Sequence, residues 1–464
     1  MEDDEILVEG KINEPLSVID ENPELNTLIE ETESQKDEKG SLSTKILSKL
    51  SKGYTCYTVS NIIAYSLNET GFILPYCLKK VGLIPYFLAL LLLIIISLYI
   101  FYIQIDVVIR FNLFKGYHDI LKGNLGRKFN SVYYIINIIY HSLILIIETN
   151  IIMLFFLKLL AFFDIDVNDK FIYPLIIIIS LILIQFPLSF INYLKKPDFF
   201  YNTFILLFVL LNVISSIIFL VYKIKIETNN EKEENDQINS INFVEKISTD
   251  YFVCFSVFIN IIGWQNQISR QLEGFKIKTT PRFFNILYIT FILEFILCLI
   301  TGLINTPLML DTESKYKIKI FLLEYNKEII PSLIIIIEIL IFIFFINIII
   351  SYRIALIEEN FVLLLKSTIY KKKELSYPPY KLIIALFKVF ILLLSSFVNL
   401  LIKDMSYIII LFGGIFASVL NFFYPIMIYS KLISGNNIVT RIAWFLSLFV
   451  IIINIIGFVL KIIF

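Results

Sequence analysis

Titratable side chains stand inside apolar segments of this chain, and in residues 131–160 their spacing places them on one helix face. Four polar residues there follow one another at intervals of three, four and seven: Tyr134, Asn137, His141 and Glu148. Residues at such intervals lie on the same side of a helix. Imidazole titrates near neutral pH and buried carboxyl groups readily take up protons, so His141 and Glu148 have the chemistry of a proton relay.

A third candidate for proton binding is Glu69. It lies in Asn68-Glu69-Thr70-Gly71, which interrupts the apolar stretch 60–83. Placing an ionisable residue at membrane depth costs free energy, so each such residue is a candidate for a functional role. The alternative for such residues is a satisfied structural network, for example Lys388 paired with Glu294 or Glu338.

The elements that carry these residues are apolar helices. Of the 464 residues, 58% are hydrophobic, against about 45–50% in a soluble domain. A helix needs roughly 20 apolar residues to cross a bilayer. The sequence therefore predicts an all-α integral membrane protein with eleven transmembrane helices: 57–78, 83–107, 131–160, 171–192, 199–222, 251–269, 284–308, 329–353, 380–402, 406–430 and 440–463.

The chain is expected to divide into a tail and two membrane halves. The predicted regions are an acidic cytoplasmic tail (1–50), spans one to five (51–222), a polar outer loop (223–250), spans six to ten (251–430) and an eleventh, peripheral span (431–464). Lys and Arg are more frequent in the loops that lie inside if the N-terminus is cytoplasmic, which predicts that orientation. Arg353, Glu358 and Glu359 mark the inner end of span eight as a solvated or gating ion-pair cluster.

The N-terminal tail is acidic and has no apolar stretch. Residues 1–40 hold 14 Asp or Glu against 3 Lys, a composition typical of disorder. Glu24-Leu25-Asn26-Thr27-Leu28-Ile29 fits the acidic-dileucine pattern recognised by vesicle-coat adaptors. A pattern this short also arises by chance in an acidic tail, and both interpretations stay open.

Two of the predicted spans are interrupted. The first breaks at Asn68–Gly71, and the sixth at the polar run Asn260–Asn266. Lipid offers no hydrogen-bond partners to unwound backbone, so such a break must be covered by protein or line a cavity. Breaks at corresponding positions of two halves indicate a five-plus-five inverted repeat with a binding site between them. The alternative for the sixth span is a glycine kink with interfacial polar residues.

Several short motifs resemble the amino acid/auxin permease family, which contains vesicular, proton-coupled and sodium-coupled neutral amino acid transporters. The matching residues are Thr70–Tyr76 followed by Lys79–Leu83, Tyr117–Ile120 with Gly123–Lys128, Trp264–Asn266 with Glu273, and Phe423–Pro425 with Tyr429–Leu432. The resemblance covers the chain from about residue 55 to its end. It implies eleven spans, a cytoplasmic N-terminus and secondary active transport of amino acids.

The chain also departs from that family. Glu69 stands near the position of one of the family's two first-span glycines, and Ala64 or Tyr65 falls where sodium-coupled members have an Asn. The departure disfavours sodium and favours protons as the coupling ion. Gln265 replaces the usual sixth-span Pro, and the paired outer-loop cysteines of some members are absent.

The breaks supply partners for both ends of an amino acid. The N–H groups of Thr70, Gly71 and Phe72 begin the second half of span one and suit a carboxylate. Carbonyl groups at the two breaks suit the ammonium. The expected substrate contacts are Asn68, Thr70, Gly71, Phe72, Ile262, Gly263, Trp264 and Asn347. Trp264 is expected to gate or wall the site, and Asn347 and Ser351 either to line it or to bind neighbouring helices.

The sequence disfavours other function classes. The formal net charge is zero and gives no indication of nucleic-acid binding, and only two His occur, without metal-ligand spacing, so neither an enzyme nor a cofactor is expected. The expected partners are an amino acid, protons and membrane lipids. The rival to a transporter is an amino-acid sensor, and the expected location is the plasma membrane or a vacuolar or lysosomal membrane.

Overall fold

The fold comes from a computed structural model, in which the chain divides into Met1–Ser51 and Lys52–Phe464. The described residues all belong to the second unit. They are 58–59, 62–63, 71, 73–110, 126–163, 172–190, 213–221, 242–264, 280–308, 332–368, 378–401, 405–433 and 438–463. The tail and its motif Glu24–Ile29 lie outside these residues.

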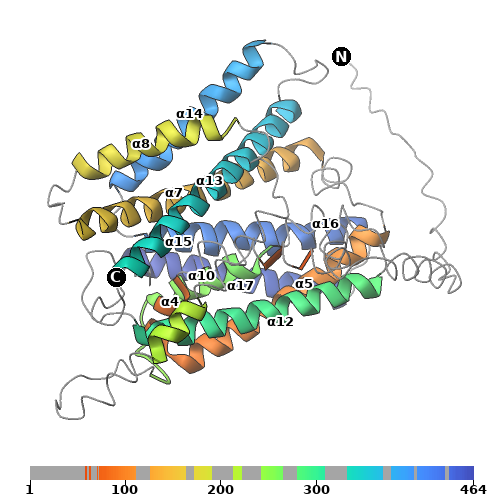
Figure 1. Cartoon of the computed structure of the whole chain (residues 1–464). Coiled ribbons are helices and arrows are strands. Elements are labelled where there is room, and N and C mark those ends of the chain that lie inside the picture. Colours follow the sequence, from red (N-terminus) through yellow and green to blue (C-terminus); the bar gives the residue numbers. More distant parts are fainter. Residues whose placement is uncertain are drawn as a thin grey trace, which may run out of the picture. The chain divides into compact units, whose positions relative to one another are not determined.

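Every regular element among the described residues is a helix (Figure 1). The α-helices are α4 (Leu74–Val81), α5 (Leu83–Arg110), α7 (Gly126–Phe162), α8 (Ile172–Leu188), α10 (Asp250–Ile262), α12 (Thr280–Asn305), α13 (Ser332–Thr368), α14 (Pro378–Leu401), α15 (Ser406–Ile409), α16 (Tyr424–Leu432) and α17 (Ile438–Ile463). Thr306–Leu308 is a short 3₁₀ helix, η4, and the π-helical turns η6 (Ile410–Phe416) and η7 (Val419–Phe423) join α15 to α16.

The prediction of a multi-pass, all-α membrane protein is confirmed. Within the described part of the chain, seven helices are long and apolar enough to cross a membrane. They are Leu83–Arg110, Lys128–Leu160, Pro281–Asn305, Ile336–Ser367, Lys381–Asn399, Ser406–Leu432 and Ile438–Ile463. These seven correspond to expected spans two, three and seven to eleven.

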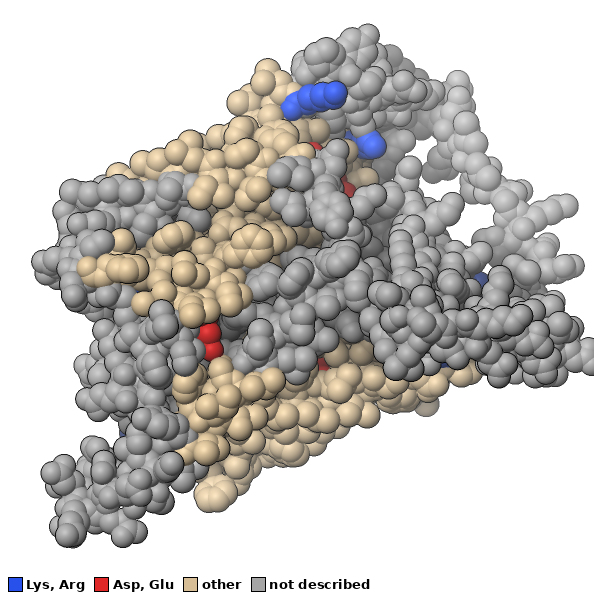
Figure 2. All heavy atoms as spheres, in the orientation of Figure 1, with Lys and Arg blue, Asp and Glu red and all other residues tan. Residues whose placement is uncertain are grey.

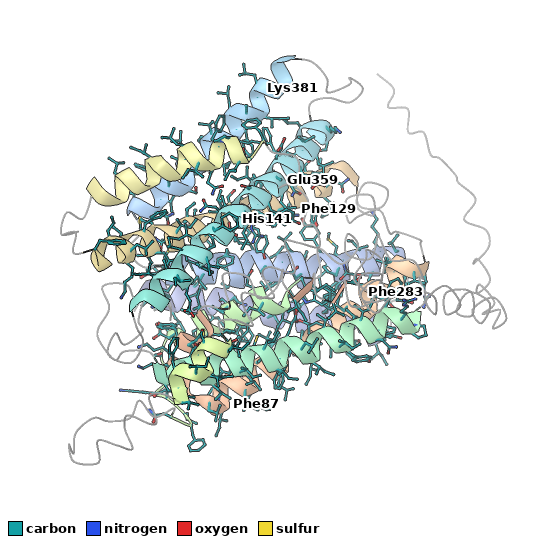
Figure 3. All side chains as sticks on the ribbon, viewed as in Figure 1. Phe87, Phe129, His141, Phe283, Glu359 and Lys381 are labelled. Atoms are coloured by element: carbon teal, nitrogen blue, oxygen red, sulfur yellow. The ribbon has the colours of Figure 1, made fainter. Side chains whose placement is uncertain are left out.

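Apolar side chains on the outside of the helices provide the surface that faces lipid. Large exposed examples include Leu88 of α5, Ile292 of α12, Phe390 of α14 and Phe445 of α17. Few described Asp, Glu, Lys or Arg side chains appear on the face in Figure 2. In Figure 3 Phe87 points away from the helices, whereas His141 lies among them.

The helices pack as two sets joined by the helix Ser406–Leu432. In the first set α4 and α5 contact each other and both contact α10 and α12, and in the second set α7, α8, α13 and α14 contact one another. Figure 1 shows the two sets as separate layers. The segment Ser406–Leu432 contacts α5 and α10 of the first set and α7 of the second.

Helix α4 is only eight residues long and is bounded by a proline and a glycine. Pro75 lies in its first turn, where the missing N–H leaves no hydrogen bond unmade. The helix ends at Gly82, whose φ of 84° favours glycine. After the turn, Leu83 N–H donates to the Asn242 carbonyl at 3.0 Å. The segment that precedes α10 therefore lies against the α4–α5 turn.

Helix α10 ends inside the segment expected to form span six. Its last residue is Ile262, after 13 residues, and Gly263 follows with φ −87° and ψ 68°. A β-carbon on Gly263 would lie 2.7 Å from Asn421 Nδ2 and closer still to the Ile259 carbonyl oxygen. Helix α10 therefore ends at Gly263, within the expected interruption 260–266, and only glycine fits there.

Helices α7 and α13 are 37 residues each, about 55 Å at 1.5 Å per residue, and they pack against each other. The expected boundary of span eight at Arg353 is wrong, because α13 continues to Thr368. Arg353 is 2% exposed and not solvated. A buried counter-charge, described below, makes an arginine acceptable in mid-helix.

Small residues let η6 and α17 approach α10 closely. A β-carbon on Gly413 would lie 2.7 Å from the Ser256 carbonyl oxygen, and one on Gly457 would lie 2.5 Å from the Phe252 side chain. Ser256 Oγ donates to Asn454 Oδ1 at 3.0 Å. One face of α17 thus packs on the broken helix α10, while much of the rest of α17 is exposed.

Replacing Gly82 by Ala should destabilise the protein by at least about 1–3 kcal/mol, the cost of a strained backbone conformation. A β-carbon there would also lie 2.8 Å from Val244 Cα. The measurement is thermal or denaturant unfolding of purified protein. Gly71→Ala is the matched control, because a β-carbon at Gly71 meets nothing within 4 Å. Equal stability of the two variants would contradict the strained turn.

Candidate functional site: a buried polar network beside two broken helices

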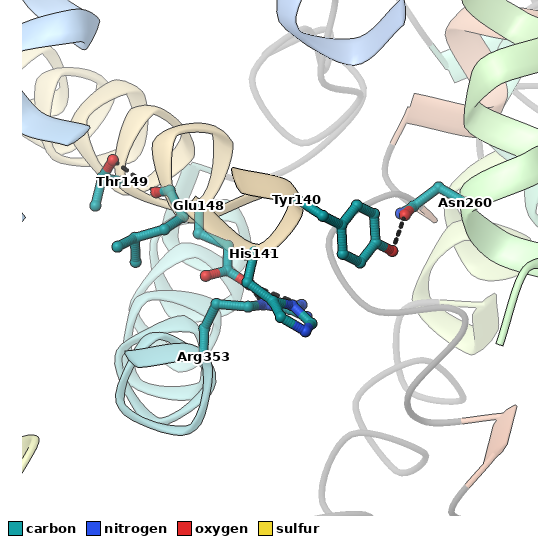
Figure 4. A network of polar contacts seen from close by, with 7 residues as sticks. Tyr140, His141, Glu148, Thr149, Asn260 and Arg353 are labelled. Atoms are coloured by element: carbon teal, nitrogen blue, oxygen red, sulfur yellow. Dashed lines mark hydrogen bonds and ion pairs between the residues drawn. The ribbon is translucent and has the colours of Figure 1, made fainter. Parts of the chain in front are cut away.

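Glu148, Arg353 and His141 form a buried polar cluster between α7 and α13 (Figure 4). Arg353 Nε and Nη2 each donate to Glu148 Oε1 at 3.1 Å. Arg353 Nη1 lies 3.4 Å from His141 Nδ1. The exposed fractions are 0% for Glu148, 2% for Arg353 and 1% for His141. The prediction that His141 and Glu148 share a helix face is confirmed, and α13 supplies the group that joins them.

The cluster balances charge inside the protein. A guanidinium stays protonated under all physiological conditions, and a buried cation without a counter-charge is strongly destabilising. Glu148 is therefore the counter-ion of Arg353. With Nη1 of Arg353 as the donor, His141 Nδ1 is the acceptor, which requires a neutral imidazole.

Tyr140 links this cluster to the broken helix α10. Its ring centroid lies 5.0 Å from that of His141, and its hydroxyl donates to Asn260 Oδ1 at 2.9 Å (Figure 4). Asn260 stands three residues before Gly263, where α10 ends. Buried polar contacts therefore run from the α7–α13 pair to the break.

A second ion pair joins α13 to α14. Lys388 Nζ lies 2.8 Å from Glu358 Oε2 and donates to the Ser189 carbonyl at 3.3 Å. The suggested pairing of Lys388 with Glu294 or Glu338 is wrong. Lys388 is 2% exposed, and its ammonium also lies 4.4 Å from the centre of the Phe190 ring.

Asn347 and Ser351 bind helix α8. Gln185 Nε2 donates to Asn347 Oδ1, and Ser351 Oγ donates to Gln185 Oε1 at 3.3 Å. Asn347 also donates to the Ile343 carbonyl at 2.7 Å. Asn347 and Ser351 were expected either to line the substrate site or to bind a neighbouring helix, and these contacts match the second expectation.

The residues of the first break are described in part. Asn68, Glu69, Thr70 and Phe72 lie outside the described residues. Gly71 is described, and a β-carbon built on it would meet no described atom within 4 Å. Because α4 begins at Leu74, Gly71 lies just before the N-terminus of this short helix.

At the second break, Ile262, Gly263 and Trp264 are all buried. Trp264 packs among aromatic rings of the first helix set. Its ring centroid is 4.1 Å from that of Phe101 and 5.6 Å from that of Phe291. Trp264 therefore contacts α5 and α12, and the first helix set fixes its position.

The two short helices α4 and α10 contact each other. Tyr251, in the first turn of α10, donates from its hydroxyl to the Val81 carbonyl of α4 at 3.1 Å. This contact joins the C-terminal end of α4 to the N-terminal end of α10. A helix N-terminus carries partial positive charge and a C-terminus partial negative charge.

Sequence reasoning missed Arg353 as the centre of the cluster, and it missed Tyr140 and Gln185 altogether. Arg353 was assigned to a span end because basic residues near spans usually mark topology. Its neighbours in the sequence gave a different signal, since apolar residues continue on both sides of it. Gln185 stands within an Ile/Leu-rich segment, where a lone amide indicates pairing between helices.

Comparison with known proteins gives no family assignment. The chain matches no protein-family model and none of the curated proteins. Within the described residues there is no group of three or more His, Cys, Asp or Glu that could hold a metal ion.

Replacing Arg353 by Met should destabilise the protein by about 3–5 kcal/mol, because the Glu148 carboxylate would lose its counter-charge inside the protein. Adding Glu148→Gln should recover most of that loss. A double-mutant cycle of unfolding free energies measures the coupling.

The exposed pair of Arg110 and Asp106 is the control. Their side chains are 62% and 27% exposed, so Arg110→Gln should cost at most about 1 kcal/mol. Additive effects of the Arg353 and Glu148 substitutions would contradict the pairing.

Proposed function

We propose that the protein is a secondary active transporter of amino acids that is coupled to protons and works by alternating access. The observation that carries the proposal is the contact between two helices too short to cross a membrane, α4 and α10, each next to an expected interruption. Interrupted helices at membrane depth are how secondary transporters expose backbone groups to a substrate. The resemblance of the motifs around Gly71 and Trp264 to amino acid/auxin permeases supports amino acids as the substrate class.

The two helix ends complement an amino acid. In the proposal the carboxylate binds the N–H groups of Thr70, Gly71 and Phe72 ahead of α4. The ammonium binds carbonyl groups at the end of α10, around Ile262 and Gly263. The open space beside Gly71 supports this arrangement. Asn68 and Trp264 complete the proposed contacts.

The helix contacts also support the proposed five-plus-five repeat within eleven spans. Four helices of the first half contact the helix expected at the same position in the second half: α4 contacts α10, α5 contacts α12, α7 contacts α13, and α8 contacts α14. Two packed sets that each draw helices from both halves are suited to rocking against each other. In the proposal the first set moves and the second holds the ion pairs of Arg353 and Lys388.

Proton coupling is proposed at Glu69 or at the His141–Glu148 face, with sodium disfavoured. The contact of Tyr140 with Asn260 supports the second choice, because it connects the charged cluster to the break of α10. Protonation of His141 would turn an acceptor into a donor facing Arg353 and weaken the cluster. The proposed setting is the plasma membrane or a vacuolar or lysosomal membrane, with the N-terminus in the cytoplasm.

Uptake of labelled amino acids into proteoliposomes with an inward proton gradient tests the proposal. Wild-type protein should concentrate at least one amino acid only when the gradient is present. Gly71→Leu should abolish uptake, because its side chain would fill the space beside the break. Glu69→Gln should permit exchange but not concentration. Glu359→Gln, at an exposed carboxylate, should behave as wild type.

Other outcomes separate the alternatives. Gradient-driven uptake that survives Glu69→Gln would place coupling at His141 and Glu148. Saturable amino-acid binding without uptake under any gradient would establish a sensor in place of a transporter. Neither binding nor uptake of any amino acid would contradict the proposal.

A further inference from the structure

Four buried polar side chains of the first helix set lie apart from the ion pairs described above. They are Ser97 of α5, Thr290 and Glu294 of α12, and Trp264 just after α10. The exposed fractions are 0% for both hydroxyl residues and 1% for Glu294 and Trp264. They differ from the residues named above in the Arg353 and Lys388 clusters.

Aromatic contacts place three elements together at this level. The ring of Trp264 lies against Phe101 of α5 and Phe291 of α12, and those two ring centroids are 5.5 Å apart. Ser97 is one turn from Phe101 on the same face of α5. Thr290 directly precedes Phe291, and Glu294 is one turn beyond Thr290 on the same face of α12.

Helices α5 and α12 run antiparallel, and two contacts between them show where Ser97 and Thr290 lie along the helix pair. Tyr86, near the start of α5, donates to the Cys298 carbonyl near the end of α12 at 2.8 Å. Tyr102, towards the end of α5, stacks on Phe284 near the start of α12 at 5.3 Å. Ser97 and Thr290 fall between these two contacts, beside the Trp264 ring.

Three of the four side chains bury a polar atom that has no hydrogen-bond partner among the described residues. These atoms are Ser97 Oγ, Thr290 Oγ1 and Trp264 Nε1. Helical Ser and Thr often bond the carbonyl one turn earlier, as Ser142 and Thr149 do here. A buried donor without an acceptor costs about 1–3 kcal/mol. Buried water usually satisfies such groups, because one molecule bridges two to four of them.

We propose that Glu294 is a proton-binding site served by ordered water that Ser97, Thr290 and Trp264 hold. Each of the three can donate to a water oxygen, and the water can in turn donate to the Glu294 carboxylate. A proton delivered along the water binds one carboxylate oxygen and leaves the group neutral, and no bond other than O–H changes. A carboxyl group in an apolar interior is strongly favoured in its neutral form.

The other titratable groups around Glu294 come from its own helix and the helices packed on it. Cys298 of α12 interacts electrostatically with Glu294, and the described helices that pack on α12 contribute Tyr86 of α5 and Cys77 and the half-buried Lys79 of α4. Thiols and phenols are ordinarily uncharged at neutral pH. Lys79 is a cation, and a nearby cation opposes proton uptake by a carboxylate. Any role of the Glu294 proton in coupling rests on the proposed function.

Trp264 reports directly on this site. The chain has two Trp, so Trp444→Phe leaves Trp264 as the sole indole. In lipid nanodiscs its fluorescence emission should change with pH as a single-proton titration. Glu294→Gln should abolish the entire change, whereas Glu338→Gln, at the half-buried carboxylate of α13, should leave it intact. Infrared difference spectra should show the C=O stretch of a protonated carboxyl that disappears in Glu294→Gln.

A second pair of variants covers the case in which Glu294→Gln fails to fold. Ser97→Ala and Thr290→Val keep the carboxylate but remove the hydroxyl groups, and each should move the titration midpoint. Absence of a titration, or one that Glu294→Gln leaves unchanged, would overturn the proton site. A titration at Glu294 in a protein that transports no amino acid would retain the site and reject only its role in coupling.

Discussion

The structure depends on one constraint, the need to cover unwound backbone inside a membrane. Helix α10 has 13 residues and α4 has eight, and neither is long enough to cross the roughly 20-residue hydrocarbon core. Lipid would leave the backbone groups at their ends without partners. Neighbouring helices therefore come close to these ends, and glycines permit the approach. Gly263, at the C-terminal end of α10, lies against Asn421, and Gly413 brings η6 close to the Ser256 carbonyl in the middle of α10.

The two helix sets are held together by different forces. In the second set α13 carries both Arg353 and Glu358, which pair with α7 and α14. Buried pairs of this kind fix the register of helices because either partner alone is destabilising. In the first set, ring contacts such as Trp264 with Phe101 and backbone hydrogen bonds at the Gly82 turn supply the contacts. The difference fits the proposal that one set holds its shape while the other repacks during transport.

Hydropathy alone predicted the seven long apolar helices that the described residues contain, because a span is a local property of about 20 residues. The end of α10 at Gly263 was also predictable, since a glycine among polar residues is a local signal. The partners of charged and amide side chains were not. Lys388 binds Glu358, Arg353 binds Glu148, and Asn347 binds Gln185. Each pair joins helices far apart in the sequence, and single-sequence periodicity shows which face a residue occupies but not which helix meets it.

The central claim is that an amino acid binds where the two broken helices meet. A chain with its four cysteines replaced and Gly71→Cys introduced tests it directly, by labelling with a membrane-impermeant thiol reagent from each side of sealed proteoliposomes. The account predicts labelling of Cys at this position that an amino acid substrate slows and that a proton gradient shifts from one side to the other. A rate of labelling that no amino acid changes, from either side, would contradict it.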